Sequence, residues 1–270
     1  VHTAGKLTLN EEQEVEIAVS AYEASLNLQI WKNYVDEIGV SVIHPGGTAI
    51  GPLQRIQGTQ RFQLGETNLL VYYGEPSPYN PYQEIYLDFI PVGSYIDDGI
   101  WKIRLTPIRI TDGAFDMWLP AGNVLNSGTG FLNPVEETTL TIPSTATKVI
   151  TVGAYDARFD QAAAFSGRGY TRATNQVKPN LVAPGVEIMS CAPGGGYQVR
   201  TGTSMATPFV TGSAALLMQW GIVNGNDAYL YGEKMKAYLI RGARKLPGFT
   251  VYPNPVLGWG ALCTANSIPR

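Results

Sequence analysis

The feature that most constrains this chain is the string from Gly202 to Pro208 (GTSMATP), which leads into an apolar run ending at Trp220. Gly202 permits a tight turn, and the small residues after it predict a closely packed helix beginning at Ser204. The Ser204 hydroxyl would then lie at the positive end of the helix, where free backbone N–H groups favour developing negative charge. A nucleophile for acyl transfer requires such a position.

A serine in front of an apolar helical run is usually an ordinary helix cap, and that interpretation applies to the bare pattern around Ser204. The complete string is much more specific than the bare pattern. It therefore favours the interpretation of Ser204 as a nucleophile.

Composition excludes several classes of function. The 270 residues, 44% hydrophobic and 15% charged, suffice for a large core in one domain or two. A net charge of −3 gives no reason to expect a nucleic acid or an anionic membrane as partner. The longest apolar run, around Ala214 to Met218, is broken by Gln219 and Gly221, so we predict a soluble protein without a membrane span.

The two cysteines, Cys191 and Cys263, form neither a disulfide framework nor a metal-binding pattern, and the sequence leaves a single bridge between them open. No Asp/Asn-rich loop has calcium-ligand spacing, so we predict no metal and no cofactor. The chain begins at Val1 without a methionine or a signal peptide, which suggests a piece of a longer protein.

The chain from residue 9 to about residue 119 alternates apolar and polar residues between Gly, Pro and Asn turns, which predicts an antiparallel sandwich of jelly-roll type. A Tyr- and Pro-rich stretch at 73–82 is typical of a packed inter-strand loop, although its tyrosines leave a ligand contact open. The predicted strands are Glu14–Val19, Leu26–Trp31, Val40–Ile43, Gln60–Leu64, Leu69–Tyr73, Glu84–Phe89, Trp101–Leu105 and Phe115–Leu119.

An α/β pattern follows a Gly-, Asn- and Ser-rich connector. Thr147–Tyr155 predicts a buried parallel strand, and Lys178–Ser190 predicts two strands separated at Pro184 and Gly185. An amphipathic helix is expected over Gly232–Arg241.

Five strings of this second part resemble the subtilisin-like serine proteases, or subtilases. They are Val149–Ala154, Phe165–Gly169, Lys178–Gly185, the Ser204 motif (Gly202, Thr203, Ser204, Met205, Ala206 and Pro208) and Gly258–Leu262. The preceding β-rich part is similar to a clostridial branch that includes the germination-associated proteases and carries a jelly-roll domain inside the protease domain.

The resemblance implies an α/β subtilisin-like fold, a parallel sheet with flanking helices, present only as its C-terminal half, plus an all-β jelly-roll-like sandwich insert. The implied domains are a loop remnant at 1–7, the inserted jelly roll at 8–120, a connector at 121–137 and the C-terminal half of the catalytic domain at 138–270. The branch further implies a Gram-positive anaerobe and an extracellular or spore-associated protein.

The family's other catalytic motifs are absent from the sequence. Subtilases orient a histidine with a buried aspartate and hold the oxyanion partly with an asparagine. Thr111-Asp112-Gly113 is a hairpin turn in reversed order, His44 is interpreted as a surface loop residue, and His2 lacks the helix that a general base would need. We therefore expect the isolated chain to be inactive.

Two hypotheses follow. In the first, the chain belongs to a serine endopeptidase acting on protein or peptide substrates, with Ser204 as nucleophile and its backbone N–H as oxyanion donor. An N-terminal segment would supply Asp, His and Asn. In the second, the chain is a non-catalytic pseudoprotease whose jelly roll binds a protein or glycan partner.

Overall fold

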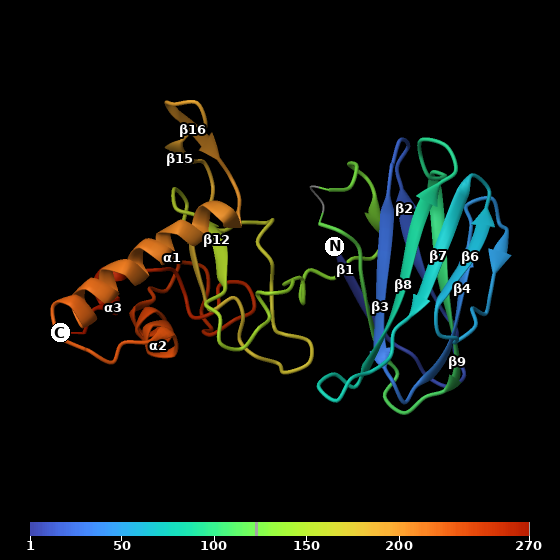
Figure 1. Cartoon of the computed structure of the whole chain (residues 1–270), viewed down its shortest axis with the longest axis horizontal. Coiled ribbons are helices and arrows are strands. Elements are labelled where there is room, and N and C mark those ends of the chain that lie inside the picture. Colours follow the sequence, from blue (N-terminus) through green and yellow to red (C-terminus); the bar gives the residue numbers. More distant parts are fainter. Residues whose placement is uncertain (122–123, 270) are drawn as a thin grey trace. The chain divides into compact units, whose positions relative to one another are not determined.

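The computed structural model describes residues 1–121 and 124–269 and divides the chain into two compact units (Figure 1). Unit 1 comprises Val1–Glu136 and unit 2 comprises Glu137–Arg270. Gly122 and Asn123, inside the predicted connector, and Arg270, at the end of the predicted catalytic half, lie outside the described residues.

Unit 1 contains all the strands that the alternating pattern predicts, most of them longer by a few residues at one or both ends. Longer strands result because hydrogen bonding to neighbouring strands continues past the alternating residues. They are β2 (Gln13–Val19), β3 (Leu26–Asn33), β4 (Glu37–Ile43), β6 (Thr59–Leu64), β7 (Thr67–Tyr73), β8 (Tyr82–Pro91), β9 (Gly99–Arg109) and β10 (Ala114–Trp118).

These strands form two antiparallel sheets. The six-stranded sheet has the order β1-β10-β3-β8-β7-β6, and the five-stranded sheet has the order β11-β2-β9-β4-β5. The added strands are β1 (His2–Lys6), β5 (Ala49–Ile50) and β11 (Gly130–Phe131). Three pairs are nested, because β1 pairs with β10, β2 with β9 and β3 with β8.

The core of unit 1 lies between the two sheets and follows directly from the alternation. In β3, Leu26, Leu28 and Ile30 are at most 1% exposed, whereas the residues between them face outward. Trp101 of the five-stranded sheet packs edge-on against Phe89 of the six-stranded sheet, with ring centroids 5.1 Å apart. One hydrophobic cluster therefore joins both sheets.

Two sequence-based boundaries differ from the structure. Residues 1–7, expected as a loop, contain β1, which pairs with β10 along its whole length and buries His2 and Thr3. The expected connector at 121–137 contributes β11, whose Phe131 is buried in the core of unit 1. Both segments lack a strong alternating pattern, and their pairing partners are remote in sequence, so only tertiary contacts reveal them.

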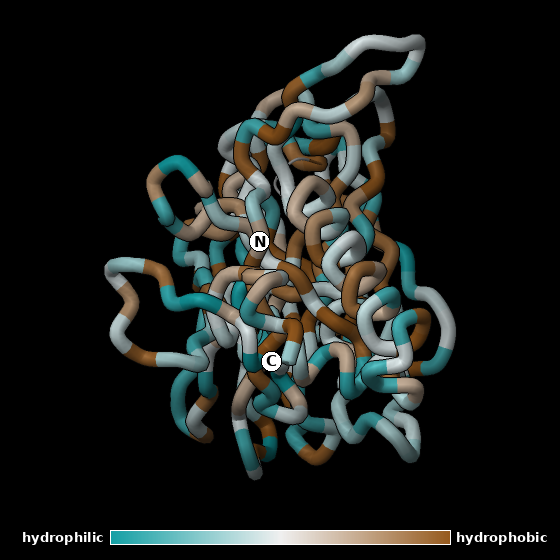
Figure 2. The backbone as a smooth tube through the Cα atoms, turned by 90° about the vertical axis from the view of Figure 1, so that its left-hand side faces the viewer, coloured by the Kyte–Doolittle hydropathy of each residue, from teal (hydrophilic) through white to brown (hydrophobic). Residues whose placement is uncertain are grey.

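Unit 2 has a small parallel core. Its three-stranded sheet has the order β13 (Gln161–Ala162), β12 (Val152–Asp156) and β14 (Leu181–Pro184), with β12 and β14 parallel as predicted. The strand after Pro184 and Gly185, β15 (Ile188–Cys191), instead forms a hairpin with β16 (Tyr197–Arg200). The hairpin projects from the unit, and its tip appears pale at the glycine-rich turn (Figures 1 and 2).

The serine motif opens the longest helix. α1 spans Thr203–Met218 and continues as a π-helix, η1 (Gln219–Val223); α2 spans Gly232–Gly242 and α3 spans Thr264–Ser267. The predicted helix over Gly232–Arg241 is confirmed by α2. Cys191 and Cys263 are both unpaired, so the bridge that the sequence left open is not formed.

Only one stripe of α1 is buried. Ala206, Val210, Ser213 and Leu217 point inward, and three of them join a cluster with Leu181 and Ala183 of β14. The expected close packing of α1 inside a core is therefore met on one side only. Thr203–Val223 has 21 residues, and an 18-residue window within it has a mean hydropathy of 1.2, which is long and apolar enough to cross a membrane by these two criteria alone.

The turn predicted at Thr111-Asp112-Gly113 is present between β9 and β10, and a buried carboxylate holds it. Asp36, 0% exposed, accepts backbone N–H groups from all three turn residues at 2.6–3.0 Å. Burial raises the pKa of Asp36, but the hydrogen bonds from Asp112, Thr111 and Gly113 outweigh it and leave this pKa below its ordinary 3.8.

We predict that Asp36→Asn lowers the free energy of unfolding by about 2 kcal/mol, because a charged acceptor of three N–H groups is lost. The stabilisation should be fully present above the ordinary pKa and disappear as the pH falls through the lowered folded-state pKa. Urea denaturation between pH 7 and pH 3 measures both effects. Asp98→Asn, at an exposed aspartate, is the control and should change stability little.

Candidate active site

The N-terminus of α1 presents Ser204 to solvent. Ser204 is the second residue of the helix and is exposed, whereas Ala206 two positions later is completely buried. The first amide groups of a helix have no intrahelical acceptor, and they point toward the region that Ser204 occupies. The sequence-based prediction of a helix start at this serine is therefore confirmed.

A close contact between two glycine backbones fixes this helix start against the sheet. Gly185, directly after β14, accepts a hydrogen bond from the N–H of Gly202 at 2.8 Å. A Cβ atom on Gly185 would lie 2.6 Å from Cβ of Ala154 on β12. Gly202 itself has φ 155°, a conformation that L side chains rarely adopt. These two glycines therefore hold the serine at the carboxyl end of the parallel strands.

Ser204 borders a cleft of about 260 Å³ within unit 2. No histidine and no carboxylate is among its lining residues, and the serine and threonine hydroxyls are its polar side chains. The lining residues are Pro143, Ser144, Val149, Ile150, Thr151, Val152, Thr203, Ser204 and Thr207.

A buried lysine organises one wall of this cleft. Lys178 is 1% exposed, and its Nζ donates to the carbonyls of Ala146 and Val149 and to Oγ1 of Thr151, each at 2.9 Å. Oγ1 of Thr151 in turn donates to the carbonyl of Ser144 at 2.6 Å. The ammonium group thus ties together residues 144–151, four of which line the cleft.

Sequence reasoning missed this role of Lys178. The string Lys178-Pro179-Asn180 resembles the family, but nothing in its local pattern predicts a buried ammonium group, because lysine is usually exposed. Three of its four acceptors lie about thirty residues earlier in the chain, which no local pattern shows. Burial, followed by the neighbouring Lys236, lowers the pKa of Lys178 to about 8.

The two histidines belong to unit 1, where both contact carboxylates. His2 is 2% exposed, has Nε2 2.9 Å from Oδ1 of Asp116 and stacks on Trp118. His44 packs edge-on against Trp101, with Nε2 3.2 Å from Oδ2 of Asp97. His44 does lie in the loop that follows β4, as interpreted, but its ring is half-buried against Trp101 and does not lie at the surface.

Comparison with known proteins assigns the region around Ser204. Residues 119–260, more than half of the chain, match the Subtilase family of peptidases. The chain therefore belongs to the Subtilase family. Serine protease AprX of Bacillus subtilis is 34% identical over 169 residues, covering 55% of this chain and 36% of AprX.

A solved structure matches nearly the whole chain. The Clostridium perfringens CspB protease is 37% identical, with a TM-score of 0.88 over 98% of this chain and 55% of CspB. The 270 residues thus have the fold of the corresponding part of that protease. They span about half of CspB and about a third of AprX.

We predict that Lys178→Met changes how stability depends on pH. The lowered folded-state pKa of about 8 means that the unfolded chain binds more protons between pH 8 and pH 10.5. The free energy of unfolding of the parent should therefore rise, relative to Lys178→Met, as the pH rises through this window.

Urea unfolding at several pH values measures this difference. Lys148→Met is the control, because Lys148 is 80% exposed and should show no such divergence. A constant difference between the parent and Lys178→Met from pH 8 to pH 10 would contradict the lowered pKa.

Proposed function

We propose that this chain carries the nucleophile of a subtilisin-type serine endopeptidase. The observation that carries the proposal is the exposed Ser204 in the first turn of α1, beside a cleft and inside the region that matches the Subtilase family. Protein or peptide chains are the proposed substrates, since AprX and CspB are both named as proteases.

The proposed chemistry is acyl transfer. Oγ of Ser204 attacks the carbonyl carbon of the scissile peptide bond while its proton passes to a general base. The N–H of Ser204 donates to the developing oxyanion, and the amine leaves after accepting the proton from the base. The base then takes a proton from a water molecule that attacks the acyl carbon, and it returns this proton to Oγ of Ser204 as the bond to the acyl group breaks and the carboxylic acid leaves.

The general base is proposed to come from polypeptide outside residues 1–270. The cleft has no histidine or carboxylate in its lining, and His2 and His44 contact Asp116 and Asp97 within unit 1. In subtilisin, loss of the catalytic histidine costs about 10⁶-fold in kcat, and loss of one oxyanion donor costs about 10²–10³-fold. Residues 1–270 alone are therefore proposed to be inactive.

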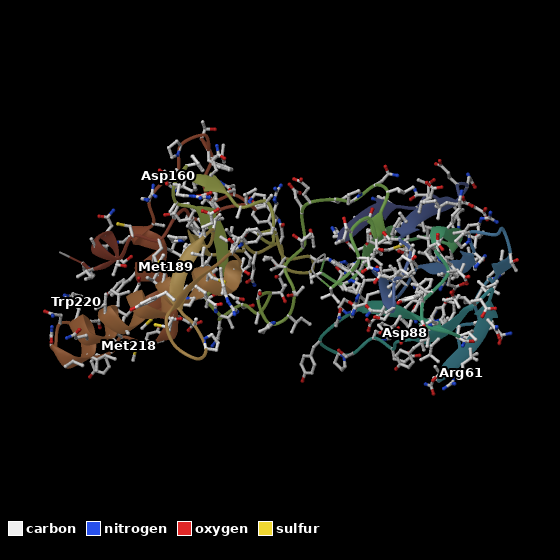
Figure 3. The ribbon with its side chains drawn as sticks, turned by 90° about the horizontal axis from the view of Figure 1, so that it is seen from above. Arg61, Asp88, Asp160, Met189, Met218 and Trp220 are labelled. Atoms are coloured by element: carbon white, nitrogen blue, oxygen red, sulfur yellow. The ribbon has the colours of Figure 1, made fainter. Side chains whose placement is uncertain are left out.

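The exposed side of α1 supports a further covering segment. Phe209, Leu216 and Met218 of α1 and Val223 of η1 are 42–77% exposed, and Met218 lies at the surface of the helix (Figure 3). One edge of β12 pairs with β14, and its other edge pairs with β13 only at Tyr155 and Asp156. The rest of that second edge pairs with no strand among residues 1–121 and 124–269. An N-terminal part of the catalytic domain, carrying Asp, His and Asn, is proposed to cover the exposed side of α1 and the unpaired edge of β12.

The domain arrangement is likewise proposed. We assign residues from 138 onward to the C-terminal half of the catalytic domain and the sandwich to a jelly-roll-like insert. The nested pairs β1 with β10, β2 with β9 and β3 with β8 support a jelly-roll type, because a long hairpin folded over itself produces such nesting.

A serine-reactive phosphonate tests the proposal. We predict that a polypeptide extended by the natural preceding sequence is labelled at Ser204, and that Ser204→Ala abolishes labelling and reduces proteolysis by about 10⁶-fold. Ser190→Ala, at an exposed serine of the hairpin, should retain both. Residues 1–270 alone should remain unlabelled.

Two outcomes would contradict the proposal in different ways. Labelling of Ser204 in residues 1–270 alone at the rate of the extended polypeptide would place the base within these residues. An extended polypeptide that is folded but never labelled would overturn the enzyme assignment and favour a non-catalytic binding protein.

A further inference from the structure

The two outer faces of the sandwich in unit 1 differ in whether their polar side chains pair with one another. On the five-stranded sheet, charged residues neutralise one another across neighbouring strands. Glu14 accepts from Arg104 at 2.8 Å and from Lys102 at 3.3 Å, and Oε1 of Glu12 accepts from Thr106 at 2.6 Å. This face is therefore satisfied by its own side chains.

The outer face of the six-stranded sheet has a second set of polar and aromatic side chains, here called the platform. They alternate with core residues along β3, β8, β7 and β6, so they all project from one side. The platform residues are Asn27, Gln29, Arg61, Tyr72, Tyr86 and Asp88.

The strand register arranges the platform in two adjacent rows. Gln29 lies opposite Tyr86, which lies opposite Tyr72, so two tyrosines occupy neighbouring strands. In the next row Asn27 lies opposite Asp88, and Arg61 is two strands beyond Asp88 on the same side of unit 1 (Figure 3). Neighbouring strands are ~4.8 Å apart, which places the backbones of the two paired tyrosines one strand spacing from each other.

Several platform side chains have no partner among the residues that the structure describes. Within the described part of the chain, the side chains of Asn27, Gln29, Tyr86 and Asp88 have no hydrogen bond or ion pair. Burial raises the pKa of Asp88, and burial followed by Asp88 and Glu84 raises the pKa of Tyr86. The hydrogen-bonding groups of these four side chains are thus partly removed from water without gaining a protein hydrogen bond.

We propose that the platform is a saccharide-binding site for an oligosaccharide chain that is neutral or carries amino groups. Sugar rings present C–H faces that pack on aromatic rings such as Tyr72 and Tyr86, and hydroxyls that pair with amides and carboxylates. Tyr72 is 46% exposed, so a ligand reaches the row from solvent.

The excess of carboxylates on the platform disfavours negatively charged ligands. Asp88 and nearby Glu84 face outward with a single platform cation, Arg61, so a polyanionic chain would be repelled. A protein partner suits the face less well, because half-buried carboxylates are depleted from the centres of protein interfaces. The proposal concerns unit 1 and does not depend on the activity of Ser204.

Isothermal titration of the whole 270-residue chain tests the site with three hexasaccharides: cellohexaose, the chitosan hexamer and hexagalacturonate. We expect saturable binding of at least one of the first two, and at least tenfold weaker binding of hexagalacturonate. Tyr86→Ala and Asp88→Asn should each weaken binding at least tenfold. Asp88→Asn preserves the side-chain shape, so it remains informative if Tyr86→Ala does not fold.

Matched controls lie elsewhere in unit 1. Tyr22→Ala removes a 73% exposed tyrosine of a loop, and Glu14→Gln alters a carboxylate of the paired face; neither should change binding. Absence of saturable binding by every oligosaccharide would overturn the proposal, as would binding that Asp88→Asn leaves intact. Equal affinity for hexagalacturonate, or a change of oligomeric state in Asp88→Asn without any sugar binding, would also overturn it.

Discussion

The close approach of two backbones at Gly185 and Gly202 determines where the reactive serine lies. Gly185 leaves room for β12 on one side and for the turn before α1 on the other, and any Cβ there would collide with Ala154. The hydrogen bond from Gly202 to Gly185 then sets the first turn of α1 at the carboxyl ends of the parallel strands. Ligands of open α/β sheets bind at this end because helix N-termini and strand ends converge there. The position of Ser204 is thus a consequence of sheet and helix packing.

The rest of the site is organised from the interior of unit 2. Lys178 has no carboxylate partner among its hydrogen bonds, and its ammonium group is instead surrounded by carbonyl and hydroxyl oxygens of residues 146–151 and by Asn180. This arrangement offsets part of the cost of burying a charge and converts a loop into a defined cleft wall. The same unit leaves much of α1 exposed, with only Ala206, Val210, Ser213 and Leu217 of the helix buried.

The two sheets of the sandwich share one core but have different outer faces. Alternation supplies a core shared by both sheets, so the outer faces are free to differ. One outer face pairs its charges across β2 and β9, whereas the platform keeps tyrosines, amides and a carboxylate unpaired. Because the two faces share one core, the contrast between them lies in the residues that point outward.

Elements whose side chains repeat regularly, or that contain a specific string, could be predicted from the amino-acid sequence. These are the eight alternating strands, the parallel pair β12 and β14, the helix start at Ser204 and membership of the subtilases. Features that depend on contacts between residues far apart in the sequence became visible with the three-dimensional fold. It placed β1 and β11 in the sandwich, buried Lys178 beneath the cleft, packed His44 against Trp101 and left the platform unpaired. Periodicity records which side of an element is buried, but it does not record which distant residue lies opposite, and that pairing produced each of these features.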